Sequence, residues 1–346
     1  MIRAAVLGDK ARLDLRSVEL RPPGAGEVRL AIDACGICGT TLDAWKAPPP
    51  GDSTGIWGHE VAGRVTALGP GVAGLALGDR VCVEPNLAVA CGACEDCLAG
   101  APFACRNRLG LPTWGFADEM IVRQAGALPV PAGLPQRTAT LAEPLASVIH
   151  GMRNSVAALR HGGRLEGARV GVIGAGVLGL LSAAVARQMG AAAVTVLARH
   201  PHQRAAAEAL GAVALGDDAQ GWAALRAEAP SLTVLAAGGG EPLLDRALSV
   251  TARRGEVVVL ALLAGDQPVN ARRAVLRDQR IGFSISYGEL DGLRDMDVAL
   301  AILAADPEGF APLVTDAFSL ADVEAAFHAA ADRAGGRLRV VVEPRG

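Results

Sequence analysis

The sequence predicts an α/β protein with two domains, the second of which is a doubly wound parallel sheet. The chain has 346 residues, half of them hydrophobic, which is long for one domain and sufficient for two cores. Its first half crowds four cysteines into residues 91–105, a density typical of a metal-bound lobe. Its second half alternates strand-like apolar runs with helical runs, and the first such pair meets at a glycine-rich turn.

Composition and charge exclude several classes of function. The formal net charge is −3 and aromatic residues make up 3% of the chain, so the basic surface and stacking rings of a nucleic-acid-binding protein are missing. The start, MIRAAVLGDKARLD, places charges where a signal peptide needs an apolar segment. The longest apolar run, Val170–Ala186, is short for a membrane span and contains four glycines. We expect a cytoplasmic homodimer or homotetramer that acts on a small molecule and binds neither nucleic acid nor membrane.

The first group of candidate ligands comes early in the chain, in CGICGTTLD (Cys35–Asp43) and GHE (Gly58–Glu60). A catalytic zinc ion needs three protein ligands and one open position. Cys38, His59 and a later carboxylate meet that need. Taken singly, each of these residues also fits an ordinary role, the cysteine as a small core residue, the histidine as a hydrogen-bonded core residue and Glu60 as a surface charge.

The second group is the cluster CGACEDCLAGAPFAC, in which Cys91, Cys94, Cys97 and Cys105 follow the spacing Cys-x2-Cys-x2-Cys-x7-Cys. A reducing cytoplasm disfavours disulfides, although a disulfide pair or unliganded thiols remain alternatives. An iron–sulfur cluster also takes four cysteines, but this spacing matches neither ferredoxin pattern. Four thiolates complete a tetrahedral zinc site and leave no open position, so we predict a structural zinc ion here and the catalysis elsewhere.

Together these segments resemble the zinc-dependent medium-chain dehydrogenase/reductase family. The resemblance rests on CGICGTTLD, on GHEVAGRVTALGPGVAGLALGDRV (Gly58–Val81) and on the four-cysteine lobe, in this order and spacing. It implies a GroES-like, β-rich catalytic domain over residues 1–150, completed by residues 287–346, and a Rossmann domain over residues 151–286.

The resemblance also implies roles for single residues. In the polyol branch of the family, a glutamate in a segment such as AEPLASVIHG lies at the catalytic metal, and here that residue is Glu143. The implied ligands of the catalytic zinc are therefore Cys38, His59 and Glu143, with Glu60 as an occasional or exchanging ligand. Thr40 stands where the family keeps a hydroxyl that contacts the substrate oxygen and passes its proton outward.

Two positions depart from the family pattern. Thr41 stands where relatives have an aspartate that accepts a hydrogen bond from the zinc-bound histidine. A hydroxyl brings no negative charge, so we expect a different metal affinity and a different pKa of a bound water. Asp43 stands where many relatives have a histidine that completes the proton relay, which leaves the exit route of the proton open.

The second half opens with RVGVIGAGVLGLLSAAVARQMGA, in which an apolar β-branched run enters a glycine turn and continues as a helix. Gly174, Gly176 and Gly179 permit the turn, the close approach of a pyrophosphate and tight helix–strand packing. Val177 and Leu178 lie between the last two glycines, where the helix N-terminus meets the negative charge. A strand before the motif and a helix after it favour dinucleotide binding.

The next predicted strand, Ala193–Ala198, ends where NAD-binding domains place an acid for the ribose hydroxyls. The chain instead reads RHPHQR, with Arg199, His200 and Arg204 and no carboxylate. An arginine there pairs with a 2′-phosphate, so we expect NADP(H) to be favoured over NAD(H). The alternative is that these residues are solvated loop charges.

Further strands are predicted at Leu232–Gly239 and Gly255–Leu263, with the helical run PLLDRALSVTARR between them. The tail after Tyr287 predicts two helical runs, DMDVALAILAAD and LADVEAAFHAAADRA, followed by strand-like GRLRVVVEP. In the resembled family this tail completes the catalytic domain.

The sequence therefore predicts a zinc-dependent, NAD(P)-dependent alcohol or polyol dehydrogenase with one catalytic and one structural zinc ion per chain. We expect zinc to act as a Lewis acid on an alcohol or carbonyl oxygen while the nicotinamide exchanges a hydride with the same carbon. Polyols, cyclitols and secondary alcohols are the expected substrates. The alternatives are reduction of an imine or an activated double bond on the same fold, and a non-catalytic cofactor-binding relative.

Overall fold

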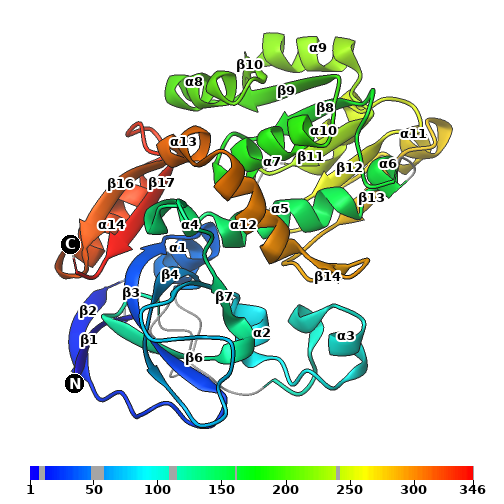
Figure 1. Ribbon diagram of the computed structural model, residues 1–346. Helices are drawn as coiled ribbons and strands as arrows, with labels where there is room; N and C mark the ends of the chain where they lie inside the picture. Colours follow the sequence, from blue (N-terminus) through cyan, green and yellow to red (C-terminus); the bar gives the residue numbers. More distant parts are fainter. Residues whose placement is uncertain (8–11, 48–57, 109–114, 160–161, 239–241, 346) are drawn as a thin grey trace. The chain divides into compact units, whose positions relative to one another are not determined.

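The computed structural model describes residues 1–7, 12–47, 58–108, 115–159, 162–238 and 242–345 (Figure 1). The chain forms two compact units. Unit 1 comprises Met1–Glu143 and Gly288–Gly346, and unit 2 comprises Pro144–Tyr287. The chain therefore leaves unit 1 at Glu143 and returns to it at Gly288.

Unit 1 is built on a seven-stranded sheet in the order β16-β17-β3-β4-β5-β7, with β6 paired to β3. Its strands are β3 (Glu27–Gly36), β4 (Glu60–Leu68), β5 (Arg80–Val83), β6 (Glu119–Arg123), β7 (Ala127–Pro129), β16 (Val314–Ser319) and β17 (Arg339–Glu343). Two hairpins accompany it: β1 (Ile2–Leu7) with β2 (Leu13–Val18), and β14 (Glu289–Leu290) with β15 (Leu293–Arg294). The C-terminal strand β17 pairs with β3, and β16 pairs with β17 at the edge, so the tail of the chain completes this sheet.

Short helices connect the strands of unit 1. They are α1 (Gly39–Lys46), α2 (Pro85–Val89), α3 (Glu95–Leu98), η2 (Pro102–Ala104), η3 (Gln124–Gly126), α4 (Gln136–Ala139), α12 (Asp295–Ala305), α13 (Pro307–Phe310), η4 (Ala311–Leu313), η5 (Leu320–Asp322) and α14 (Val323–Ala331). A buried aromatic cluster ties the ends of the chain together. The ring of Phe327 on α14 packs 5.7 Å from Trp45 on α1 and 5.3 Å from Phe116, between centroids. This packing holds α1 against α14.

Unit 2 contains a six-stranded parallel sheet in the order β10-β9-β8-β11-β12-β13. Its strands are β8 (Arg169–Ile173), β9 (Ala193–Ala198), β10 (Val213–Gly216), β11 (Leu232–Leu235), β12 (Glu256–Val259) and β13 (Arg280–Phe283). Its helices are α6 (Val156–Leu159), α7 (Val177–Gln188), α8 (Pro201–Ala209), α9 (Ala219–Glu228), α10 (Leu243–Val250) and α11 (Ala271–Leu276), and α5 (Ala142–Arg153) enters it from unit 1.

The strand order of unit 2 is that of a doubly wound sheet. From β8 the chain moves outward through β9 and β10, and it then crosses over to β11, β12 and β13 on the other side. Right-handed crossovers in opposite directions place helices on both faces of such a sheet. The predicted α/β fold is therefore confirmed.

The predicted strands of unit 2 are present but mostly shorter than expected. The run predicted at Leu232–Gly239 ends at Leu235, and Gly239 lies outside the described residues. The run predicted at Gly255–Leu263 forms a strand over Glu256–Val259 only. The apolar residues that follow these strands lie in the loops at the carboxyl edge of the sheet.

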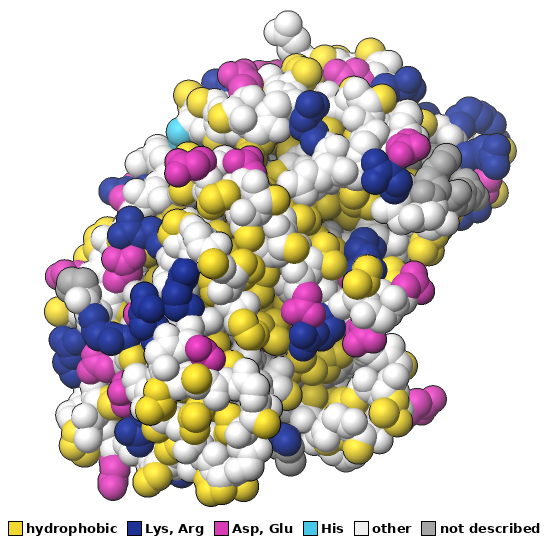
Figure 2. Space-filling model, in the orientation of Figure 1, with side chains coloured by type: hydrophobic (Ala, Val, Ile, Leu, Met, Phe, Trp, Pro, Cys, Tyr) yellow, Lys and Arg dark blue, Asp and Glu magenta, His cyan; other side chains and the backbone are white. Residues whose placement is uncertain are grey.

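None of the helices in the described ranges is both long and apolar enough to cross a membrane. The run Val170–Ala186 instead forms β8, a turn and α7, as its glycines predict. On the face shown in Figure 2, basic and acidic side chains are interspersed among hydrophobic ones.

Candidate metal centres and dinucleotide-binding turn

The register of one antiparallel strand pair brings Cys38 and His59 together. Strand β3 pairs with β4 so that Gly36 lies opposite Glu60. Cys38 follows Gly36 by two residues and occupies the N-cap position of α1, and His59 directly precedes β4. Both residues therefore lie at the same end of the β3–β4 strand pair.

A sulfur, a ring nitrogen and a carboxylate oxygen meet at this end. Ligand atoms of Cys38, His59 and Glu60 all lie within 4.8 Å of one another. Burial alone raises the pKa of the Cys38 thiol, but the hydrogen bond with His59 and its positive charge outweigh this and lower the pKa to about 6. Burial alone lowers the pKa of His59, but Cys38 and the negative charge of Glu143 raise it to about 9. This low pKa favours the thiolate form of Cys38, the form of cysteine that binds metals.

Two threonines and an aspartate of α1 follow Cys38 in the sequence, namely Thr40, Thr41 and Asp43. The Thr40 hydroxyl donates a hydrogen bond to Cys38 Sγ at 3.3 Å, so it lies beside the predicted metal ligand. Thr41 is buried, whereas Asp43 is exposed. Thr40 is therefore accessible to solvent, while Thr41 faces the interior.

Glu60 carries a partner that the sequence did not indicate. Its side chain is fully buried and forms an ion pair with Arg339 on β17, whose side chain is 7% exposed. The guanidinium also donates to the carbonyl of Ile37 at 2.7 Å. Antiparallel pairing of β17 with β3, with Val341 opposite Gly36, brings this arginine to the site. No local pattern predicts it, because the pairing joins opposite ends of the chain.

Glu143 lies in the first turn of α5 and is half-buried. Its charge acts on His59, as the raised pKa of the imidazole indicates. Among the described residues, however, the carboxylate grouped with Cys38 and His59 is that of Glu60. Both predicted carboxylates are thus associated with His59. Glu60 belongs to the group of ligand atoms, and Glu143 acts on the imidazole through its charge.

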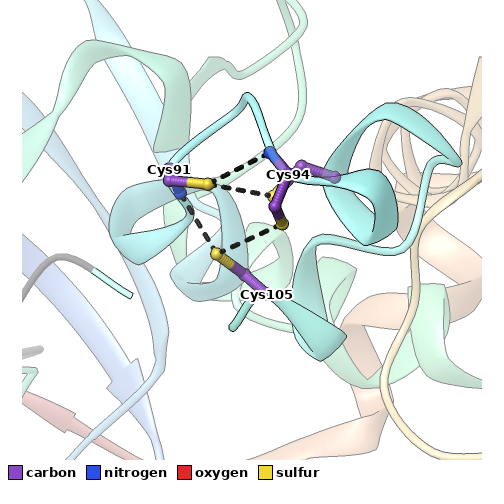
Figure 3. A group of neighbouring side chains, drawn as sticks. Cys91, Cys94 and Cys105 are labelled. Atoms are coloured by element: carbon purple, nitrogen blue, oxygen red, sulfur yellow. Dashed lines mark hydrogen bonds between the residues drawn. The ribbon is translucent and has the colours of Figure 1, made fainter. Parts of the chain in front are cut away.

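The four-cysteine cluster gathers around the start of α3. Cys94 is the N-cap residue of α3, Cys97 lies within that helix and Cys105 follows η2. Figure 3 shows the sulfurs of Cys91, Cys94 and Cys105 turned toward one another. Backbone amides of Ala93 and Cys94 donate to Cys91 Sγ and lower the pKa of that thiol to about 6.

The sulfur positions test whether this donor set fits zinc. The Sγ–Sγ distances are 3.9 Å for Cys91–Cys97, 3.5 Å for Cys94–Cys97 and 3.9 Å for Cys94–Cys105. A tetrahedral site with Zn–S bonds of about 2.3 Å requires sulfurs about 3.8 Å apart. All seven cysteines are free of disulfides, so the sulfur spacing fits a metal site and not a bridge.

The glycine turn has the geometry that its spacing predicts. Gly174 adopts a φ of +97°, which favours glycine, and a Cβ there would lie 2.7 Å from Ala237 Cβ. A Cβ on Gly179 would collide with the carbonyl oxygen of Gly174, so helix α7 packs closely on the turn. A Cβ on Gly176, the N-cap residue of α7, would meet no protein atom within 4 Å. Open space thus faces the helix N-terminus at Gly176, which a phosphate bound there would require, and the next residues, Val177 and Leu178, are partly buried.

The three basic residues after β9 each make a different contact. Arg199 forms an ion pair with Asp217 at 3.1 Å. Arg204 folds back and donates to the carbonyls of Ala198 and Arg199, both at 3.3 Å. His200 caps α8 and its ring stacks on that of His202, 5.5 Å between centroids. Sequence reasoning missed Asp217, which the neighbouring strand β10 supplies.

Two family models match the chain. The alcohol dehydrogenase GroES-like domain matches residues 24–132, and the zinc-binding dehydrogenase domain matches residues 177–304. The first covers most of the N-terminal part of unit 1, and the second covers the sheet of unit 2 from α7 onward and extends into α12.

The individual proteins to which the chain is similar are also named as dehydrogenases. L-threonine 3-dehydrogenase of Pyrococcus abyssi is 37% identical over 210 residues, which are 58% of this chain and 56% of that protein, so the match spans little more than half the length of that relative. L-galactonate-5-dehydrogenase of Escherichia coli is 31% identical over 256 residues, 72% of either chain. A crystal structure of a zinc-binding dehydrogenase from Sinorhizobium meliloti bound to NADP superposes with a TM-score of 0.85 at 25% identity, over 99% of both chains.

Proposed function

The chain belongs to the zinc-dependent medium-chain alcohol dehydrogenase family, and from this premise we propose that it transfers a hydride between NADP(H) and an alcohol/carbonyl pair. The observation that carries the proposal is the group of Cys38, His59 and Glu60, with the Thr40 hydroxyl beside it. A thiolate, an imidazole and a carboxylate are the donors of an open zinc site.

The catalytic zinc would be held by Cys38, His59 and one carboxylate. Zinc supplies a Lewis acid there, which makes an alcohol more acidic or a carbonyl more electrophilic. The chain's own residues prepare this site. The hydrogen bond with His59 keeps Cys38 as a thiolate, and Arg339 holds Glu60 in place by charge. Glu60 and Glu143 are the two candidates for the third ligand: Glu60 is grouped with Cys38 and His59 but pairs with Arg339, and the charge of Glu143 acts on His59.

The proton would move through Thr40. Its hydroxyl, hydrogen-bonded to Cys38, lies on an exposed stretch of α1 and serves as donor and acceptor to the substrate oxygen. Asp43 follows Thr40 by one helical turn on the same exposed face. It stands where many relatives have a histidine, and it would be the next acceptor of the proton.

The second zinc ion would be structural and held by Cys91, Cys94, Cys97 and Cys105. The sulfur distances near those of a tetrahedron support this assignment. Four protein ligands leave no position for a substrate.

The dinucleotide would lie on the turn at Gly174, Gly176 and Gly179 with its pyrophosphate at the start of α7. NADP(H) is the proposed cofactor, because Arg199, His200 and Arg204 follow β9 and no acid stands among them. The Sinorhizobium relative bound to NADP supports this choice.

The proposed substrate is a polyol, a cyclitol or another secondary alcohol. Relatives named as dehydrogenases of L-galactonate and L-threonine oxidise hydroxyl-bearing compounds, which supports the class and leaves the individual compound open. Reduction of an imine or an activated double bond is the competing activity on the same fold.

Metal analysis together with a substrate screen tests this proposal. The wild-type protein should bind about two zinc ions per chain and oxidise members of a panel of polyols and secondary alcohols with NADP. Cys38→Ser should lose one ion and turnover yet bind dinucleotide normally. Cys82→Ala, which removes a buried cysteine outside both groups, should keep both ions. One zinc ion in the wild type, without turnover, would instead identify a non-catalytic relative.

We also propose that the chain forms a homodimer or homotetramer. Strand β13 lies at one edge of the parallel sheet, and Phe283 and Ile285 near its end are 73% and 63% exposed. Unpaired strand edges with apolar side chains favour association with a second copy.

A further inference from the structure

An acid lies directly beside Arg199: Asp217 follows β10 as Arg199 follows β9, and the two strands are neighbours. Strands β9 and β10 run parallel with Gly216 opposite Ala198, so Asp217 and Arg199 follow their strands side by side. Arg199 Nη2 lies 3.1 Å from Asp217 Oδ2. The acid that the end of β9 lacks is therefore supplied by the end of β10.

Asp217 is held in place more firmly than its partner. The indole Nε1 of Trp222, a residue 5% exposed, donates to Asp217 Oδ1 at 2.8 Å. The Asp217 side chain is 25% exposed, whereas that of Arg199 is 70% exposed. A fixed carboxylate thus lies beneath a guanidinium that faces solvent.

This pair borders the glycine turn. The amide of Gly174 donates to the carbonyl of Leu197 at 3.1 Å, so the turn lies against the last residues of β9. A dinucleotide on this turn extends its adenosine ribose toward the end of that strand. The 2′ position of the ribose consequently comes to the neighbourhood of Arg199 and Asp217.

Building on the proposed cofactor site, we propose that Asp217 sets how strongly this chain discriminates between a 2′-phosphate and a 2′-hydroxyl. Its charge offsets that of Arg199 and opposes a phosphate that carries roughly −1.5 to −2 charges at pH 7. The preference for NADP is therefore smaller than Arg199 alone would produce.

Calorimetric binding of two cofactor fragments tests this role without catalysis. The probes are 2′,5′-ADP and 5′-AMP, which differ only in the 2′-phosphate. Asp217→Asn keeps an oxygen for the Trp222 hydrogen bond but removes the charge. It should lower the Kd of 2′,5′-ADP by roughly three- to tenfold, the size expected for one nearby charge in a partly screened site. The Kd of 5′-AMP should stay unchanged.

Asp218→Asn is the matched control. It removes one negative charge at the next residue, and asparagine caps α9 as well as the aspartate that now accepts from the Gly221 amide. Its 2′,5′-ADP affinity should stay close to that of the wild type. An equal gain in 2′,5′-ADP affinity in both variants, or no gain in Asp217→Asn, would overturn the proposed role of Asp217 but not the cofactor site. Failure of the wild type to bind either fragment would overturn the cofactor site itself and this inference with it.

Discussion

The ion pair between Glu60 and Arg339 lies in the interior of unit 1, where neither charge has ready access to water. Burial lowers the pKa of Arg339, while the charges of Cys38 and Cys35 oppose this effect. A buried charge left without its partner is costly, because it keeps its desolvation penalty and loses the attraction that offsets it. The arginine therefore stabilises unit 1 and positions the carboxylate next to the candidate metal ligands.

Arg339→Met should destabilise the protein strongly. The expected loss is about 3–5 kcal/mol, as for other buried pairs broken on one side, measured as the free energy of unfolding in urea. Arg337→Met is the control, because Arg337 pairs with Asp316 at 3.2 Å with both side chains about one-third exposed. It should cost about 1 kcal/mol or less. Similar losses in the two variants would show that Arg339 contributes no more than a surface charge.

Glu84 is a buried acid of unit 1 that belongs to neither group of candidate metal ligands among the described residues. Burial raises its pKa to about 8, Arg294 opposes this shift, and Asp297, Asp295 and Glu143 add to it. Its Oε2 atom has no hydrogen-bond partner among the described residues. The folded state therefore favours the protonated acid.

This shift predicts a specific dependence of stability on pH. Between the unfolded pKa near 4.5 and the folded pKa of about 8, the folded state binds a proton that the unfolded state releases, so stability falls as pH rises across this window. Glu84→Gln should remove this dependence and gain roughly 2–4 kcal/mol over the wild type at pH 8.5. Urea unfolding of both proteins from pH 5 to 8.5 measures the difference. Parallel curves for the two proteins would rule out a raised pKa.

At the scale of elements, the glycines of the β8–α7 turn meet two different requirements. One is close packing of the helix, and the other is access for a ligand. Gly179 serves packing, since a side chain there collides with the Gly174 carbonyl. Gly176 serves access, since a side chain there meets open space in the protein and its φ of −73° suits any residue. Folding and binding therefore depend on different glycines.

Alanine substitutions should separate these requirements. Gly179→Ala should cost about 1–3 kcal/mol of unfolding free energy through overpacking. Gly176→Ala should cost about 1 kcal/mol or less, but it should abolish tight dinucleotide binding, because the added methyl group occupies the path of the pyrophosphate. Thermal unfolding and cofactor titration measure the two effects. Normal binding by Gly176→Ala would place the pyrophosphate elsewhere.

The cysteine lobe contains a helix that contributes no buried side chain. Helix α3 has four residues, all of them at least partly exposed. Helices this short are not stable by themselves in water. We infer that metal binding holds the lobe in this conformation.

Cys97→Ser should remove one zinc ion and lower the midpoint of thermal unfolding by roughly 5 °C or more. Leu98→Ser is the control, because Leu98 is the next residue and is 77% exposed. It should keep the zinc content and the melting temperature. Unchanged melting in Cys97→Ser with lost turnover would contradict the structural assignment.

At the scale of the whole molecule, the two edges of the parallel sheet differ in what they expose. The β13 edge carries exposed Phe283 and Ile285, and the neighbouring helix α11 exposes Val275 and Leu276. The opposite edge, β10, exposes Val213. We expect association through the more apolar edge.

Phe283→Asp should therefore shift the protein toward monomer in sedimentation velocity experiments, because it places a charge at the proposed interface. Val213→Asp adds the same charge at the other edge and should leave the assembly intact. A monomeric wild type, or dissociation caused by Val213→Asp, would contradict the proposed interface.

Local sequence determined those features whose parts lie close together in the chain. The glycine turn could be predicted because a strand, three glycines and a helix follow one another within one unit. The cysteine cluster could be predicted because its four ligands lie within fifteen residues, as its spacing shows. The strand–helix alternation likewise determined the doubly wound sheet. Strands β10 and β13 were not predicted, since both are short and neither contains a buried residue.

Tertiary structure decided which distant residues complete the sites. Arg339 reaches the carbonyl of Ile37 across 302 residues of chain, through the pairing of β17 with β3. Asp217 reaches Arg199 through the register of β10 with β9. In both cases a charge acquires its partner through strand pairing and not from its local sequence. The physical reason is that burial and hydrogen-bonded strand register select the partner of a charge, and neither leaves a periodic signal in the sequence.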